Sequence, residues 1–164
     1  MMKTEDIRPL VETFRCISDE LGVMHDLLQQ ECHALTNRIV AEIESVALKK
    51  QSSVDRILDR TELQRRFFES KQIANGEAGL ERFLERFDTQ NPDLVELRNY
   101  QKKIREYLEQ CKKLNVCNGA SIELLNRHTR RTIDVLRNAG NPAHTYGPDG
   151  NTHNIAVSRA RISV

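Results

Sequence analysis

Apolar residues recur every three or four positions along most of this chain, which is the spacing of one face of an α-helix. In residues 7–43 the series consists of Ile7, Leu10, Phe14, Ile17, Leu21, Met24, Leu28, Leu35, Ile39 and Ile43. The pattern loosens over residues 40–53, where we expect a break or a bend. It resumes over residues 53–73 and ends near Asn75 and Gly76. We therefore predict two helices in this half of the chain.

Two further helices are predicted after Gly76. Residues 80–88 place four apolar side chains on one face, namely Leu80, Phe83, Leu84 and Phe87. Pro92 suits the first position of a helix, where no partner is needed for a backbone N–H, and the pattern then continues over residues 93–138. A helix of that length spans roughly 70 Å at about 1.5 Å per residue, so other helices must line it.

These segments predict an all-α fold, an elongated antiparallel bundle or coiled coil of long helices over residues 1–138. The remaining residues, 139–164, are rich in Gly, Pro, Asn and His at their start and have no helical period, so we expect a flexible, non-helical tail. Residues 5–31 are mostly acidic and residues 98–137 mostly basic. The two regions could lie side by side as antiparallel helices, or each could face a different partner.

Composition narrows the class of protein. Charged residues make up 30% of the chain and aromatic residues only 5%, a balance that suits long amphipathic helices. The formal net charge of +1 argues against a polycation that coats nucleic acid or an anionic membrane. The first ten residues carry acids and no apolar run approaches the ~20 residues of a membrane span. We expect a cytoplasmic protein without membrane insertion.

The sequence offers no sign of an active site. Its acids are spread along helix faces beside Lys and Arg, and no nucleophile, phosphate-loop, dinucleotide or zinc-protease motif is present. We predict no enzymatic activity, no cofactor and no small-molecule substrate. The spacing of the Cys and His residues matches no zinc site, so we expect free thiols and no metal; the residues considered are Cys16, Cys32, Cys111, Cys117, His25, His33 and His128.

A group of arginines near the end of the last helix could form a surface for nucleic acid. It consists of Arg127, Arg130, Arg131 and Arg137. Phosphate contacts need little more than such a group, but Glu123 and Asp134 dilute its field and no aromatic residue is interleaved for base stacking. We favour a solvated or partner-facing basic stripe over nucleic-acid binding.

The segment NVCNG in the last helix breaks its apolar seam with Asn115 and Asn118, and Gly119 lets a neighbouring backbone come close. A polar residue at a seam position lowers stability but fixes register. The segment is either a register lock inside the bundle or a local gap between a part that packs internally and a part that meets a partner.

The tail contains turn chemistry at Gly147-Pro148-Asp149-Gly150. Tyr146 precedes the turn, and it either anchors a partner pocket or folds back onto the end of the bundle. The residues that follow, NIAVSRARISV, lack clean alternation and could add a strand to the sheet edge of a partner or stay free.

The order of these parts resembles the FlgN family of flagellar type III export chaperones. The resemblance rests on KKQSSVDRILDRTELQRRF, NVCNG, LLNRHTRRTIDVL and TYGPDG, followed by a basic tail that ends in RISV. Its most specific parts are Asn118-Gly119 and the tail motif from Tyr146 to Gly150. The resemblance covers most of the chain.

The resemblance implies a cytoplasmic chaperone that binds hook-associated proteins of the FlgK and FlgL type, which form the hook-filament junction. It implies that the chaperone prevents their premature assembly and delivers them to the type III export gate. In the family, the C-terminal helical part holds the substrate and the tyrosine of the tail docks on the cytoplasmic domain of the gate. By motif, docking is assigned to Tyr146, Gly147, Asp149 and Gly150.

The substrate-binding positions come from periodicity within the region that the resemblance indicates. They are Leu114, Asn118, Gly119, Ile122, Leu125, Ile133 and Leu136. Two other functions stay open at this point. One is a coiled-coil adaptor or structural protein that closes its seam in a homo-oligomer, and the other is a regulator that binds nucleic acid through the stripe from Arg127 to Arg137.

Overall fold

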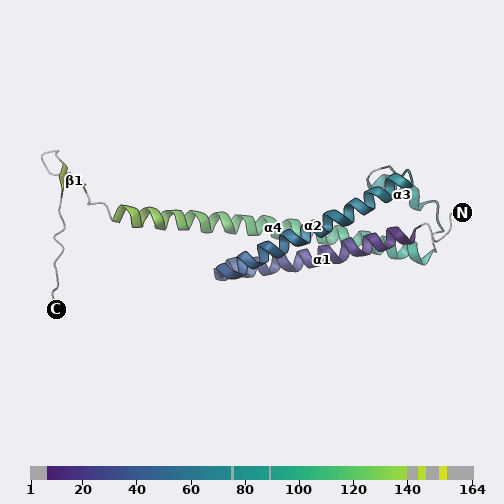
Figure 1. Cartoon of the computed structure of the whole chain (residues 1–164), viewed down its shortest axis with the longest axis horizontal. Helices are drawn as coiled ribbons and strands as arrows, with labels where there is room; N and C mark the ends of the chain where they lie inside the picture. The colour runs from purple at the N-terminus through teal and green to yellow at the C-terminus, as the bar shows by residue number, and fades with distance from the viewer. Residues whose placement is uncertain (1–6, 75, 89, 140–143, 147–151, 155–164) are drawn as a thin grey trace. The chain divides into compact units, whose positions relative to one another are not determined.

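The computed structural model describes residues 7–74, 76–88, 90–139, 144–146 and 152–154, and it confirms the all-α fold (Figure 1). The elements are α1 (Arg8–Asn37), α2 (Val40–Ser70), α3 (Glu77–Leu84), α4 (Pro92–Ala139), β1 (His144–Tyr146) and β2 (Thr152–Asn154). The chain divides into two compact units, residues 1–121 and 122–164. None of the described helices is both long enough and apolar enough to span a membrane.

α1 ends earlier than the apolar pattern predicted. Arg38 adopts a left-handed conformation with φ 57°, and the N–H of Ile39 donates to the carbonyl of Ala34 at 3.0 Å. This is a left-handed helix cap made without glycine. The apolar residues Ile39 and Ile43, which extended the pattern, therefore belong to the link and to α2.

The predicted break or bend over residues 40–53 was wrong, because α2 is continuous from Val40 to Ser70. Small or short side chains carry its packing there, with Val46 4% exposed and Ser53 fully buried. A buried serine leaves no apolar signal in the sequence, which is why the period seemed to fail. At its other end α2 stops at Ser70, and Gln72 at φ 55° and Gly76 at φ 97° redirect the chain.

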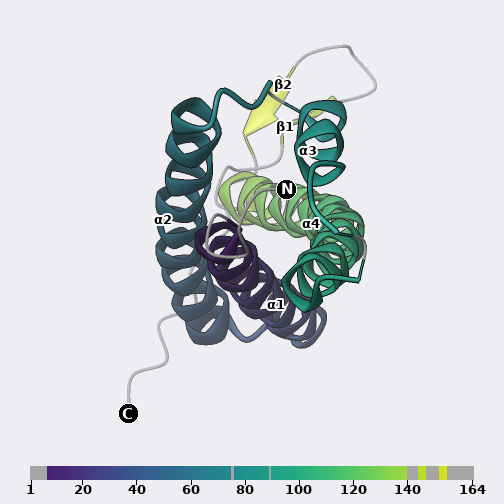
Figure 2. The same cartoon turned by 90° about the vertical axis from the view of Figure 1, so that its right-hand side faces the viewer.

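The long helices of the first unit differ in direction. α2 is antiparallel to α1, since Lys50 pairs with Glu31 at 2.7 Å and Arg56 pairs with Glu20 at 2.9 Å. α4 instead runs parallel to α1, because Asp93 lies 3.5 Å from Arg8 at one end whereas Asn118 bonds the Leu28 carbonyl further along. Figure 2 shows α1 between α2 and the first part of α4.

Acidic α1 and basic α4 are therefore neighbours, but not antiparallel ones. The chain crosses to α2, returns through α3, and enters α4 beside the start of α1. Two acids of α1, Glu20 and Glu31, pair with bases of α2. Basic side chains of α4 therefore do not form ion pairs with these two acids of α1 and are available to other acidic side chains.

The main core joins the start of α1, the end of α2, α3 and the start of α4. Its most buried side chains are Ile7, Leu10, Phe83, Leu84, Leu94 and Leu97. A smaller cluster of Met24, Leu28 and Cys111, flanked by Ile57 and Leu114, continues the packing along the bundle. Each fully buried Leu or Ile contributes about 1.5–3 kcal/mol.

α3 carries most of the face predicted for residues 80–88, since Leu80, Phe83 and Leu84 are buried; α3 ends at Leu84, and Phe87 is buried from the turn that follows it. Gly79 allows this packing, because a Cβ there would lie 1.8 Å from the carbonyl oxygen of Ala74. The predicted start of the last helix at Pro92 is confirmed.

Beyond α4 the chain forms a short antiparallel pair, in which His144 lies opposite Asn154 and Tyr146 opposite Thr152. The predicted tail is non-helical at these residues, as expected, but it contains strands that the sequence did not suggest. The turn predicted at Gly147-Pro148-Asp149-Gly150 lies outside the described residues.

Candidate functional site

One face of α4 is buried along the first unit. Leu94 and Leu97 are 2% and 0% exposed in the main core, and Cys111 is 9% exposed in the smaller cluster. Leu114 is half-buried against the same cluster. The positions follow the helical period predicted for this segment, so the seam is real, and residues of α1 pack against it in both clusters.

The last buried residue of this face is Asn118, which is 1% exposed. Its Nδ2 donates to the Leu28 carbonyl at 2.9 Å and to Glu31 Oε2 at 2.8 Å. Lys50 of α2 donates to the same Glu31 oxygen at 2.7 Å. We call Asn118, Glu31 and Lys50 the Asn118 clamp, because they join α4, α1 and α2.

The clamp supports the register-lock interpretation of the NVCNG segment. A buried amide that must meet one carbonyl and one carboxylate fixes the axial position of α4 on α1, because sliding α4 would bury the amide unpaired. Asn115, by contrast, is exposed. Gly119 is also exposed and has open space where a Cβ would lie, so the expected close approach of a backbone at Gly119 was wrong.

Sequence reasoning missed Glu31 and Lys50. A signal for Glu31 was present, since it occupies a seam position between Leu28 and Leu35 in the apolar series of α1. Glu31 is only 5% exposed, and a carboxylate at such a position requires donors from its neighbours. Nothing in the sequence indicates that Lys50 supplies one of them.

Past Asn118 the same face of α4 has no buried side chain among the residues whose burial is described, up to Arg137. Ile122, Ile133 and Leu136 are 38%, 42% and 68% exposed, and Leu125 is half-buried. At 3.6 residues per turn these four positions continue the stripe of Leu97, Ile104, Cys111 and Asn118. We call Ile122, Leu125, Ile133 and Leu136 the open face.

The structure thus divides the predicted substrate-binding residues into two groups. Leu114 and Asn118 contact α1 within the first unit, where Gly119 is exposed, whereas the open face belongs to residues 122–164. Leu124 and Val135, which are 50% and 67% exposed, lie on another side of the helix and were not predicted. Tyr146 lies in β1, and Gly147, Asp149 and Gly150 lie outside the described residues.

Basic side chains also lie on this part of α4. Arg127, Arg130, Arg131 and Arg137 are exposed, and no ion pair within 4.0 Å is found for them among the described residues. Further back on α4, Arg98 contacts Glu81 at 3.2 Å and Arg105 pairs with Glu77, both on α3.

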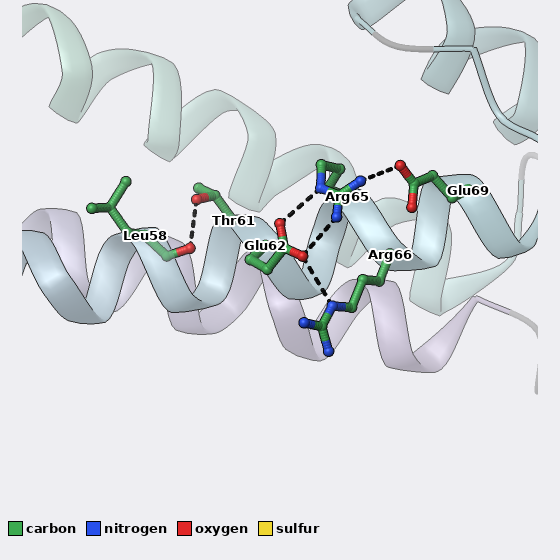
Figure 3. Close-up of polar contacts among 6 residues, drawn as sticks. All are labelled: Leu58, Thr61, Glu62, Arg65, Arg66 and Glu69. Atoms are coloured by element: carbon green, nitrogen blue, oxygen red, sulfur yellow. Dashed lines mark hydrogen bonds and ion pairs between the residues drawn. The ribbon is translucent and has the colours of Figure 1, made fainter.

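The densest charge network lies on α2 and does not form an active site (Figure 3). Glu62 accepts from Arg65 at 2.7 Å and from Arg66 at 3.0 Å, and Arg65 also pairs with Glu69. Hydrogen bonds from Arg65 and then Arg66 lower the pKa of Glu62 to about 2. All four residues are three or four positions apart on one exposed helix surface, which is the geometry of helix-stabilising pairs.

The remaining reactive groups do not converge. Among the described residues no three His, Cys, Asp or Glu side chains gather as a metal site. Cys111 is buried, which raises the pKa of its thiol, whereas Cys117 is exposed. A groove of about 780 Å³ between α1 and α2 is lined mostly by polar side chains such as Asp26, His33 and Lys49 and is open to solvent.

Comparison with known proteins gives one match. The family described as FlgN protein matches residues 7–154. No curated protein and no solved structure matches the chain.

Proposed function

The chain belongs to the FlgN family of flagellar export chaperones for hook-associated proteins, as its sequence resemblance predicted, and we propose how it performs this role. It holds a hook-associated protein on the open face of α4. It delivers that protein to the type III export gate in the cytoplasm through the segment that follows residue 138. Residues 1–138 act as the chaperone domain and residues 139–164 as the docking segment.

The observation that carries the proposal is the change in burial along one face of α4. The stripe is covered by the other helices of the first unit as far as Asn118 and is exposed at Ile122, Ile133 and Leu136. In the first unit, residues of α1 lie beside residues of α4 about 85 to 90 positions later, as in the pairs Arg8 with Asp93 and Leu28 with Asn118. Because α1 ends at Asn37, this offset leaves Ile133 and Leu136 without a partner from α1.

An amphipathic segment of the hook-associated protein would supply those partners. Burial of a few hundred Å² of apolar surface on each side, at about 25 cal/mol per Å², is enough for capture. Ordering a disordered segment costs a large part of this gain, which keeps the complex reversible. A segment held in this way cannot join other copies, so premature assembly is prevented until the client is released.

The docking role is proposed for Tyr146 with Gly147, Asp149 and Gly150. It is supported by the match of the family through residue 154 and by the tail motif in the sequence. Residues 144–146 and 152–154 are separate in sequence from the open face and pair with each other. A docking segment of this kind can engage the gate while α4 still holds the client.

The holding role is tested with Leu125→Asp and Ile133→Asp in the full chain. Each should lower affinity for a hook-associated protein about 10-fold or more in calorimetric titration, because a carboxylate would be desolvated in the contact. Leu124→Asp is the matched control, since Leu124 is exposed on another side of α4. Equal losses in all three variants, or global unfolding seen by circular dichroism, would refute the assignment of the open face.

The docking role is tested with Tyr146→Ala. This variant should keep the affinity of the wild-type chain for the hook-associated protein and lose affinity for the cytoplasmic domain of the gate. Loss of both affinities would show that the two surfaces are not separate.

A further inference from the structure

The contact between α3 and α4 shows how an amphipathic helix packs against α4. Leu80, Phe83 and Leu84 of α3 are buried in the same cluster as Leu94 and Leu97 of α4. Along one edge of this contact, Glu81 pairs with Arg98 at 3.2 Å and Glu77 pairs with Arg105. The later glutamate meets the earlier arginine, so these pairs run antiparallel.

The charged residues in this contact have different spacings on the two helices. Arg98 and Arg105 are seven residues apart, or about 10.5 Å along α4, whereas Glu77 and Glu81 are four residues apart, or about 6 Å. Both arginines directly follow a residue of the buried stripe, namely Leu97 and Ile104. They therefore border the same side of that stripe, and their long side chains reach the acids of α3.

The second part of α4 repeats this arrangement without an acidic partner. Arg130 and Arg137 are again seven residues apart, and each directly follows a position of the continued stripe, Thr129 and Leu136. Both arginines are exposed, and no ion pair is found for either of them within the described part of the chain. Arg98 and Arg105 flank one side of the buried part of the stripe. Arg130 and Arg137 flank the same side of its exposed part, the open face.

We propose that the client segment held by α4 imitates α3. It is an amphipathic helix that lies antiparallel to α4, with two carboxylates four residues apart along one edge of its apolar face. These carboxylates pair with Arg130 and Arg137, while the apolar face covers Leu125 and Ile133. This inference rests on the proposed function and adds the charge pattern by which α4 selects and orients its client.

Charge complementarity favours such a helix over nucleic acid. Glu123 and Asp134 lie among the arginines, and residues 122–139 contain no Phe, Tyr or Trp for base stacking. The apolar open face would also stay exposed against a phosphate backbone. An acidic amphipathic helix uses both the apolar and the basic features of the segment.

The test compares two charge reversals in the full chain. The edge variant carries Arg130→Glu and Arg137→Glu, and the back variant carries Arg127→Glu and Arg131→Glu. Both change the net charge equally, but Arg127 and Arg131 lie on the side of the helix away from the stripe. The probe is a hook-associated protein that the wild-type chain captures, titrated at about 50 mM and about 500 mM NaCl.

The edge variant should bind the probe about 10-fold more weakly than wild type at low salt, and the difference should shrink at high salt. The back variant should stay within about 3-fold of wild type at both salts. A probe whose paired carboxylates are changed to Lys should regain affinity for the edge variant only. These results together would support the proposal.

Equal losses in the edge and back variants would overturn the proposal, because they would indicate a general field rather than paired contacts. An edge variant that binds like wild type would overturn it as well. So would RNA retention that the edge reversal abolishes while probe binding is unchanged. Failure of the proposed function looks different: Leu125→Asp would then bind the probe as tightly as wild type at both salts.

Discussion

Replacing Asn118 with Ala should destabilise the first unit by about 1–3.5 kcal/mol. The side chain donates to the carboxylate of Glu31 at 2.8 Å and to the Leu28 carbonyl at 2.9 Å. A hydrogen bond to a charged group is worth about 1.5–3 kcal/mol and one to a neutral carbonyl about 0.5–1.5 kcal/mol. Removal of Asn118 Oδ1, which is buried without a partner, returns about 1 kcal/mol or more of this loss.

A second substitution at the same position separates electrostatics from packing. Asn118→Asp has nearly the same shape, so it leaves no cavity, but it places a second carboxylate beside Glu31 in a site that is 1% exposed. Lys50 can neutralise only one of the two charges. We expect Asn118→Asp to cost about 3–5 kcal/mol at neutral pH, more than Asn118→Ala, because a buried charge without a partner is strongly destabilising.

Urea unfolding followed by circular dichroism at 222 nm measures both effects. The matched control is Asn115→Ala, which removes the same amide from an exposed position of the same helix and should stay within about 0.5 kcal/mol of wild type. The reasoning would be refuted if Asn118→Ala behaved like Asn115→Ala, or if Asn118→Asp were as stable as wild type.

Three further predictions concern the core, the thiols and the surface of α2. Leu97→Ala should cost about 2–5 kcal/mol in the same unfolding assay, because Leu97 is fully buried, and a loss below 1 kcal/mol would contradict the core assignment. Burial raises the pKa of Cys111, so less thiolate is present at a given pH and alkylation measured by mass spectrometry should be slower than at exposed Cys117; equal rates would contradict that burial. Glu62 should titrate by NMR with a midpoint near 2, its favourable pairing being complete above the ordinary carboxyl pKa and lost as the pH falls through about 2. Arg65→Ala should raise this midpoint, and an ordinary midpoint in the wild-type chain would show that the pairs do not persist in solution.

Much of the fold follows from local physical chemistry that the sequence displays. The period of apolar residues identified α3 by Leu80, Phe83 and Leu84, and Pro92 marked the start of α4. These signals are readable because a helix with one apolar face must bury that face. The family was also readable from its motifs, and its match over residues 7–154 confirms it.

Other features depended on contacts between distant residues. α1 ends at Asn37 because Arg38 adopts a left-handed conformation, and an arginine in the sequence does not predict that conformation. α2 stays helical through residues 40–53 because Val46 and Ser53 pack within the bundle, and no local pattern reports that packing. The parallel direction of α1 and α4 follows from the return of the chain through α2 and α3.

The sequence by itself determined that the chain is helical, that α4 carries an apolar stripe interrupted at Asn118, and which family it belongs to, because side-chain period and motif are local properties. Only the tertiary structure decided where that stripe stops being core. The boundary at Asn118 arises because the Leu28 carbonyl and Glu31 accept hydrogen bonds from its amide, Glu31 being held in turn by Lys50, and because α1 ends at Asn37, short of the end of the stripe. The length of one helix and the partners of a buried polar group are relations between segments far apart in the chain, so they cannot be read from either segment alone.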